Sequence, residues 1–297
     1  MVLDMWGIFQ KIREEFTPFE AFNMLLGCVC LPQQLYMLGH TQFIHDAFTE
    51  IYGTFEGIEP IILLWGSGSD MMAGRDSEGL MMPKSWIWQT KAMWSLCCPL
   101  DSPRAAEARQ FLEDPKLASP KTYFENTVTA LQQQQRQAAA VGVGEGQKGH
   151  TTSYHNIAVF VNFCNSYWVA LANERYGNYE RAMVFADGGI QKDVMVPGAN
   201  AGVRWRSLCH CIRGRILAKE AGTKVEALAA FEAAIAEAKS CELYYLECLA
   251  LRDMDRCLRP SGIHERISKV RGKFNKGVLV GDNLDDFNRI LDNHSIF

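Results

Sequence analysis

The sequence lacks an uninterrupted apolar run of about 18 residues, the length that a membrane-spanning helix requires. The nearest stretch, Ala21 to Gly39, is broken by Pro32 and by the polar pair Gln33 and Gln34. The sequence also lacks the basic segment, apolar run and small-residue cleavage site that together mark a secretory signal. These absences predict a chain without a membrane span and without a secretory signal.

The overall composition excludes several classes of protein. Hydrophobic residues make up 48% and charged residues 22% of the 297 residues, which excludes a globally disordered or collagen-like chain. The formal net charge of -4 disfavours a protein whose whole surface contacts nucleic acid, because such a surface is usually basic. Ten cysteines without a secretory signal favour reduced thiols in a cytoplasmic or nuclear compartment.

No segment carries a complete catalytic, metal or cofactor signature. Cys28-Val29-Cys30, Cys97-Cys98 and Cys209-His210-Cys211 do not form the paired C-x2-C halves of a zinc site. Residues 144–149 have the G-x-G-x-x-G spelling, but they follow a glutamine-rich segment instead of the strand that a dinucleotide site requires. We therefore expect no catalytic residue, no metal ligand and no cofactor.

Proline and glycine divide the chain into predicted helices and a linker. Ser102-Pro103 and Ser119-Pro120 each combine a capping residue with proline at the first turn, which predicts helices near 102–113 and 119–140. Residues 141–152 contain four glycines within eight positions, a composition typical of a flexible linker. The predicted organisation is an N-terminal helical region over 1–140 and a C-terminal region over 153–297.

The C-terminal region contains a patterned series of small and aromatic residues. Gly214 precedes a turn glycine, Gly222, and the series Ala227, Phe231 and Ala234 follows. Small residues on a first helix let a second helix approach closely, and an aromatic side chain fills the seam between them. The pattern resembles a tetratricopeptide repeat, with one extra residue before the second helix.

A weaker copy of the same pattern precedes the unit from Gly214 to Ala234 in the sequence. Ala170 takes the small position, Gly177 and Tyr179 the turn, and Ala182 and Ala186 the second-helix face. The two turn glycines are 45 residues apart in the sequence, which is longer than the usual repeat of about 34. The resemblance covers roughly residues 160 to 258, and residues 241–258 would pack as a helix at the end of the stack.

The resemblance implies an all-α fold, either a tetratricopeptide-like right-handed solenoid or an irregular helical bundle. In the solenoid, first helices line a concave face that binds a partner protein or peptide, and no chemistry is implied. The chain is then an adaptor or assembly subunit. The groove positions carried over from the family are Tyr167, Leu171, Glu174, Cys211, Arg215 and Ala218.

Two basic segments suggest an acidic partner, although each has a simpler interpretation. One surrounds a predicted first helix and comprises Arg204, Arg206, Arg213, Arg215 and Lys219. Its arginines are suited to clamping a carboxylate or phosphate, but they also fit a solvated helix face. The other covers 259–276 and precedes a segment with four aspartates, so it fits a self-neutralising tail as well as an anion or nucleic-acid contact.

An enzymatic alternative rests on the segment from Ile61 to Asp70. Its apolar run followed by Gly66-Ser67-Gly68-Ser69-Asp70 is similar to the first motif of Rossmann-like methyltransferases, which would bind a nucleotide or S-adenosylmethionine. The acidic residue expected within the strand is missing, and the following segments are predicted to be helices. Substantial strand content would favour this alternative over the adaptor.

Overall fold

The computed structural model describes residues 91–96, 98, 100–114, 166–190 and 202–274, and the chain forms two compact units, Met1–Asn165 and Ser166–Phe297. The described residues form helices and turns without any strand, which confirms the all-α prediction. The turn Gly66–Asp70, the predicted helix 119–140 and the predicted linker 141–152 lie outside these residues. In the described part of the chain, no helix is both long enough and apolar enough to cross a membrane.

In the first unit, a helix begins where proline predicts it. Helix α5 covers Pro103–Glu113, with Pro103 at its first position and Ser102 before it. Proline fits there because its missing N–H would have no partner in the first turn. The Ser102 hydroxyl makes no capping hydrogen bond, so the proline is the part of the predicted signal that acts.

Residues 91–96 form a separate helical segment whose Trp94 side chain is buried, as expected for a core aromatic residue.

The second unit is a succession of helices joined by short turns. The helices cover 166–175, Tyr179–Ile190 (α8), Val203–Lys219 (α9), Lys224–Ser240 (α10), Tyr244–Leu258 (α11) and Ile263–Phe274 (α12). They pair as three helical hairpins. We call 166–175, α9 and α11 the first helices, and α8, α10 and α12 the second helices.

A glycine in the left-handed region lies in the turn of every hairpin. The φ angles are 80° at Gly177, 92° at Gly222 and 75° at Gly262, values that residues with a β-carbon rarely adopt. At the second turn the hydroxyl of Thr223 donates to the carbonyl oxygens of Leu217 (2.5 Å) and Glu220 (3.1 Å). These bonds supplement the hydrogen bond from Glu220 N–H to Leu217 O (3.2 Å) at the C-terminal end of α9, where the last carbonyl groups lack a partner four residues on.

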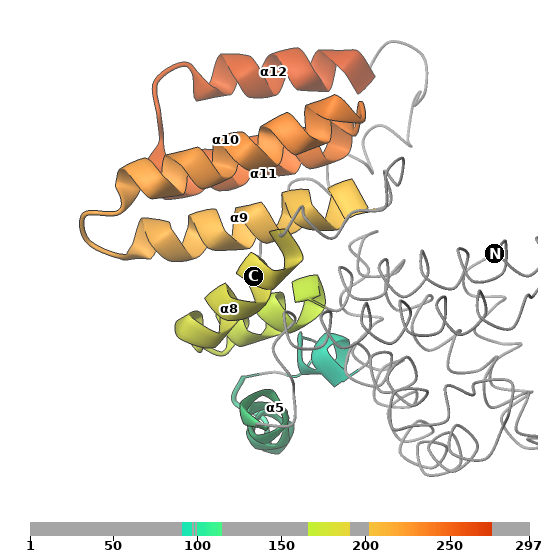
Figure 1. Ribbon diagram of the computed structural model, residues 1–297, viewed down its shortest axis with the longest axis vertical. Helices are drawn as coiled ribbons and strands as arrows, with labels where there is room; N and C mark the ends of the chain where they lie inside the picture. The colour runs from blue at the N-terminus through green and yellow to red at the C-terminus, as the bar shows by residue number, and fades with distance from the viewer. Residues whose placement is uncertain (1–90, 97, 99, 115–165, 191–201, 275–297) are drawn as a thin grey trace, which may run out of the picture. The chain divides into compact units, whose positions relative to one another are not determined.

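The first helices lie side by side and run in the same direction. Helix α9 packs against both α8 and α10, and it also contacts α11. Tyr167 and Trp205, near the starts of their helices, have ring centroids 5.6 Å apart, whereas Glu174 and Arg215 meet near the ends. Contacts between starts and between ends require parallel helices. Figure 1 shows α9, the α10–α11 pair and α12 following one another in chain order.

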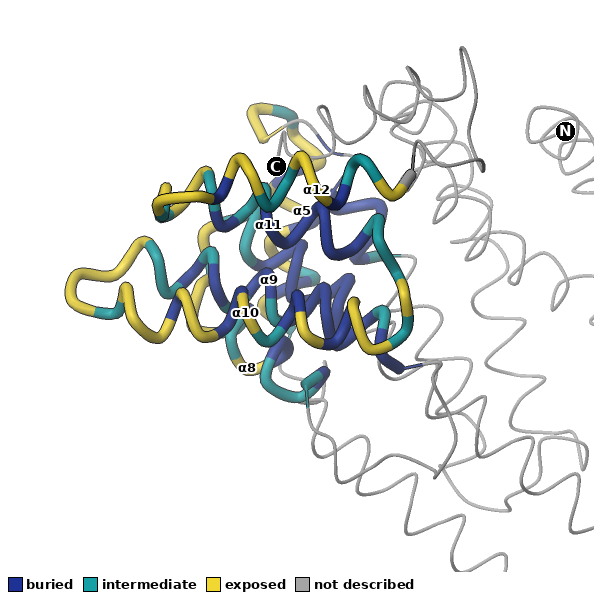
Figure 2. The backbone as a smooth tube through the Cα atoms, turned by 90° about the horizontal axis from the view of Figure 1, so that it is seen from above, coloured by how far each residue is buried: buried dark blue, intermediate teal, exposed yellow. Residues whose placement is uncertain are grey.

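A close helix contact lies in the second hairpin. A β-carbon built on Gly214 would be only 2.8 Å from two ring atoms of Phe231, so the aromatic ring packs directly on the backbone of α9. Ala227 and Ala234 flank this ring on α10 and are fully buried. Small residues therefore let the two helices approach, and Figure 2 shows buried residues where α9, α10 and α11 meet.

The end of the stack differs from the sequence prediction. Residues 241–258 are expected to be a terminal packing helix, but α11 is followed by α12, which packs on it as a third hairpin. The missed helix lies in the basic segment, where charged residues obscure a stripe of Ile263, Ile267 and Val270. Ile263 and Val270 are buried, and this spacing is typical of one helix face.

Candidate functional site

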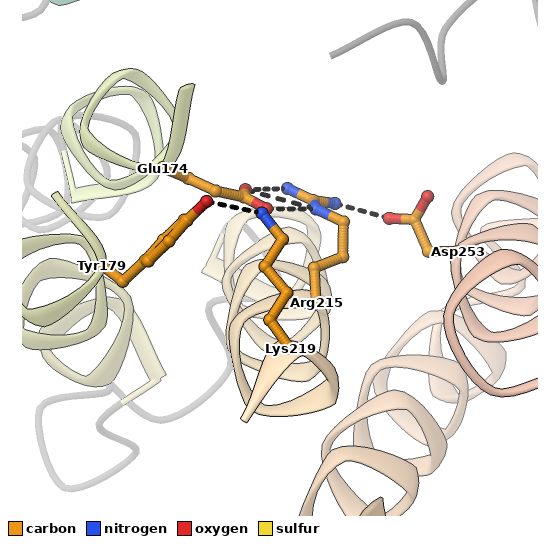
Figure 3. A network of polar contacts seen from close by, with 5 residues as sticks. All are labelled: Glu174, Tyr179, Arg215, Lys219 and Asp253. Atoms are coloured by element: carbon orange, nitrogen blue, oxygen red, sulfur yellow. Dashed lines mark hydrogen bonds and ion pairs between the residues drawn. The ribbon is translucent and has the colours of Figure 1, made fainter. Parts of the chain in front are cut away.

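An ion-pair ladder crosses the three first helices near their C-terminal ends (Figure 3). Arg215 of α9 lies in the middle, where its Nε donates to both carboxylate oxygens of Glu174 (2.9 and 3.2 Å) and its Nη2 donates to Glu174 Oε2 (2.6 Å). On the other side, Arg215 Nη1 donates to Asp253 Oδ2 of α11 at 2.5 Å. One guanidinium therefore joins three helices, an arrangement that its planar fork of donors permits.

The ladder is partly shielded from water. The side chains of Arg215, Glu174 and Asp253 are 20%, 10% and 16% exposed. Burial alone would lower the pKa of Arg215, but the adjacent carboxylates of Glu174 and Asp253 outweigh it, and the net pKa is raised well above its ordinary value. The two carboxylates therefore favour the charged form of this guanidinium.

A second polar contact lies beside the ladder at the end of α9. Lys219 Nζ donates to the hydroxyl of Tyr179 at 3.1 Å and lies 4.4 Å from the centroid of the same ring. Tyr179 is 39% exposed, so this pair is accessible to solvent. Figure 3 shows Lys219 directed toward Tyr179 and Arg215 directed toward Glu174 and Asp253.

The structure separates the six predicted groove residues into two groups. Tyr167, Leu171 and Cys211 are 4%, 5% and 3% exposed, and burial raises the pKa values of the Tyr167 hydroxyl and the Cys211 thiol. These three side chains therefore pack between helices and do not line an open surface. Glu174, Arg215 and Ala218 are only partly covered. Of the six predicted groove residues, Glu174, Arg215 and Ala218 are therefore the ones that remain partly accessible to solvent.

Sequence reasoning missed Asp253 as a member of this site. It pairs with Arg215 across 38 residues of sequence, and Glu174 pairs with Arg215 across 41. Counting forward from Arg215 by roughly one repeat length leads into the predicted helix 241–258. This count could have identified Asp253 as a partner of Arg215. The sequence pattern places Tyr179 in a turn, but its contact with Lys219 follows only from the arrangement of α8 beside α9.

The cations around α9 bind carboxylates of the same chain. The guanidinium of Arg206 donates to Glu237 Oε2 of α10 at 2.8 Å in a buried ion pair, and Arg213 pairs with Asp187 of α8. Arg215 is held between its two carboxylates. Because these charges are matched within the fold, they stabilise helix packing. The structure therefore does not support a bidentate anion clamp made of these three arginines.

The described residues provide hydrogen-bond donors and acceptors at this site, without a recognisable reactive arrangement. Within 91–96, 98, 100–114, 166–190 and 202–274, no three His, Cys, Asp or Glu side chains gather as metal ligands would. The buried thiols of Cys211 and Cys248 have raised pKa values because of burial, which disfavours the nucleophilic thiolate. Comparison of the chain with protein-family models, curated proteins and solved structures finds no match.

Proposed function

We propose that this chain is a non-catalytic adaptor or assembly subunit that binds an extended segment of a partner protein across its first helices. The observation that supports the proposal is the ladder of Glu174, Arg215 and Asp253, which joins three parallel helices and remains partly exposed. Because the three helices lie side by side, one extended segment can contact all of them. Stacked hairpins that resemble tetratricopeptide repeats commonly bind partners on such a face.

The chemistry of the face suits a peptide main chain. Glu174 and Asp253 supply acceptors, and Arg215 and Lys219 supply donors. A peptide presents a donor and an acceptor at almost every residue, so it can match a surface on which both kinds of group alternate. The balanced charge of the ladder favours this mode over recognition of an acidic group alone. The ten cysteines support a cytoplasmic or nuclear location.

Ala218 offers the sharpest test, because it lies one turn beyond Arg215 on α9 and is partly exposed. Substitution Ala218→Arg would obstruct the face without breaking any ion pair of the ladder. The matched control is Ala229→Arg on the exposed side of α10. Each variant and the wild-type chain would be used to capture partners from source lysate, with quantification by mass spectrometry and a thermal unfolding measurement on each.

We expect a stoichiometric protein partner that the wild-type chain and Ala229→Arg retain and that Ala218→Arg loses. Equal retention by both variants would exclude this face, and the absence of any protein partner would contradict the adaptor function. A tightly bound nucleotide or S-adenosylmethionine in place of a protein would favour the enzymatic alternative at Gly66–Asp70. Arg215 itself is a less suitable test, because its removal would leave two adjacent, poorly solvated carboxylates.

A further inference from the structure

The last helix of the described fold, α12, packs on α11 and forms ion pairs with carboxylates of α10 and α11. Among residues 263–273 of this helix, whose burial the structure describes, Ile263 and Val270 are the buried ones. In contrast, α9 and α10 each bury most of one face and meet through Phe231 and Gly214. Figure 2 shows exposed residues along α12. A helix at the edge of a stack, with two buried apolar residues over 263–273, is expected to open more readily than the central helices.

Two carboxylates, one exposed on α10 and one buried on α11, meet cations of α12. Glu232 of α10 accepts hydrogen bonds from Arg266 Nη1 (2.6 Å) and Nη2 (2.9 Å) in a bidentate pair. Glu247 of α11, which is 2% exposed, has Lys273 Nζ of α12 at 3.9 Å from Oε2. Helix α12 therefore contributes two buried apolar side chains, Ile263 and Val270, and two cations that meet carboxylates of α10 and α11.

The buried carboxylate does not depend on α12 alone. Lys239 of α10 lies 3.4 Å from Oε1 of Glu247, so one cation stays beside the carboxylate when α12 moves away. Departure of α12 would also admit water to the group. The hinge is the four-residue turn 259–262, in which Arg259 and Gly262 have φ angles of 48° and 75°. The underlying α10–α11 surface can thus exist without its cap.

We propose that α12 is a releasable cap over a docking surface on α10 and α11, and that this surface accepts a basic amphipathic helix of a partner protein in place of α12. The covering helix itself specifies the required chemistry. A ligand helix needs apolar residues at the spacing of Ile263, Ile267 and Val270, and cations at the spacing of Arg266 and Lys273. Amphipathic helices bind hydrophobic grooves in this way. This surface is distinct from the first-helix ladder, so the proposal stands independently of the proposed function.

Exchange of one helix for another can be tested by charge reversal across the Arg266–Glu232 pair. The probe is a fluorescent synthetic peptide of residues 261–274, added to the full-length chain. Wild-type chain should bind it weakly, because the attached α12 competes at an effective concentration of about millimolar. Full-length Arg266→Glu repels its own α12 from Glu232 and should bind the native peptide at least about tenfold more tightly than the wild-type chain does.

A reversed acceptor gives the complementary measurement. In the full-length Glu232→Arg chain, the native peptide should bind poorly, and a peptide carrying Arg266→Glu should bind at least about tenfold better. A peptide carrying Lys269→Glu is the matched control, because Lys269 lies on the exposed side of α12 and its reversal should leave affinity unchanged. The proposal would be overturned if the Arg266→Glu chain did not bind the native peptide more tightly than the wild-type chain does, or if the Glu232→Arg chain did not prefer the Arg266→Glu peptide.

Amide hydrogen exchange on the unmodified chain keeps the test independent of how the variants fold. The amides of α12 should exchange at least about tenfold faster than those of α9, because local opening of the cap precedes global unfolding. If the amide hydrogens of α12 exchanged no faster than those of α9, the cap would not open, and the proposal would be refuted. Exchange in α9 and α10 of each variant confirms that the rest of the unit remains folded.

Discussion

Replacement of Gly214 by alanine tests whether the second hairpin is packed as tightly as the structure indicates. The new β-carbon would lie 2.8 Å from Cε1 and Cζ of Phe231 and 2.9 Å from Cδ1, closer than the 3.0 Å limit that β-carbons ordinarily respect. Phe231 is completely buried, so its ring cannot move into solvent. Relief requires a shift of α10 away from α9, against the close packing of a protein interior.

The expected magnitude follows from two opposing effects. Alanine is favoured over glycine within a helix by about 1 kcal/mol, whereas an added carbon in a well-packed core costs about 1 to 3 kcal/mol. Gly214→Ala should therefore destabilise the α9–α10 contact by up to about 2 kcal/mol in free energy of unfolding. Gly272 of α12 is the matched control, because a β-carbon added there would have no neighbouring atom within 4 Å.

Amide hydrogen exchange measured separately in each helix is the suitable assay, because the chain has two compact units and a single unfolding transition need not describe both. Gly214→Ala should reduce protection in α9 and α10, and Gly272→Ala should increase protection in α12. In a Phe231→Leu background the smaller side chain should remove the penalty of Gly214→Ala. Equal gains in protection from both alanine substitutions would refute the packing argument.

Three further predictions concern an ion pair, a carboxylate and a thiol of the second unit. Glu237→Ala should destabilise the chain by about 3 to 5 kcal/mol because it leaves the guanidinium of Arg206 buried without its carboxylate, whereas the double variant Arg206→Met/Glu237→Leu should recover most of that loss in urea unfolding. The hydrogen bond from Arg266 lowers the pKa of Glu232, so the stabilisation by this ion pair is present above the ordinary glutamate pKa of about 4.3 and is lost as the pH falls through the lowered pKa. Glu232→Gln should therefore remove the acid-dependent loss of hydrogen-exchange protection in α12. Identical pH profiles for the variant and the wild-type chain would contradict this prediction. Cys257 is exposed and Cys211 is buried, so maleimide labelling mapped by mass spectrometry should modify Cys257 at least about tenfold faster, and equal rates would show that α9 is not packed as described.

Local signals in the sequence predict much of the helical architecture. Proline at position 103 marks the start of α5, and the glycines at 177 and 222 mark turns with positive φ angles. Gly214, Ala227 and Phe231 predict a close pair of helices, which the structure contains. These features depend on the conformational limits of single residues or on spacing along one helix, so neighbouring sequence is enough to reveal them.

The sequence by itself thus determined the all-α class, the turns at Gly177 and Gly222 and the small residues that permit close packing, whereas it did not reveal α12. Only the tertiary structure decided that Tyr167, Leu171 and Cys211 are buried and that Arg215 joins Glu174 to Asp253. The physical reason is that partners 41 and 38 residues apart meet only when each helix has a particular rotation about its own axis. That rotation is set jointly by all the neighbouring helices, since each residue turns the helix by about 100°, and no single helix encodes it.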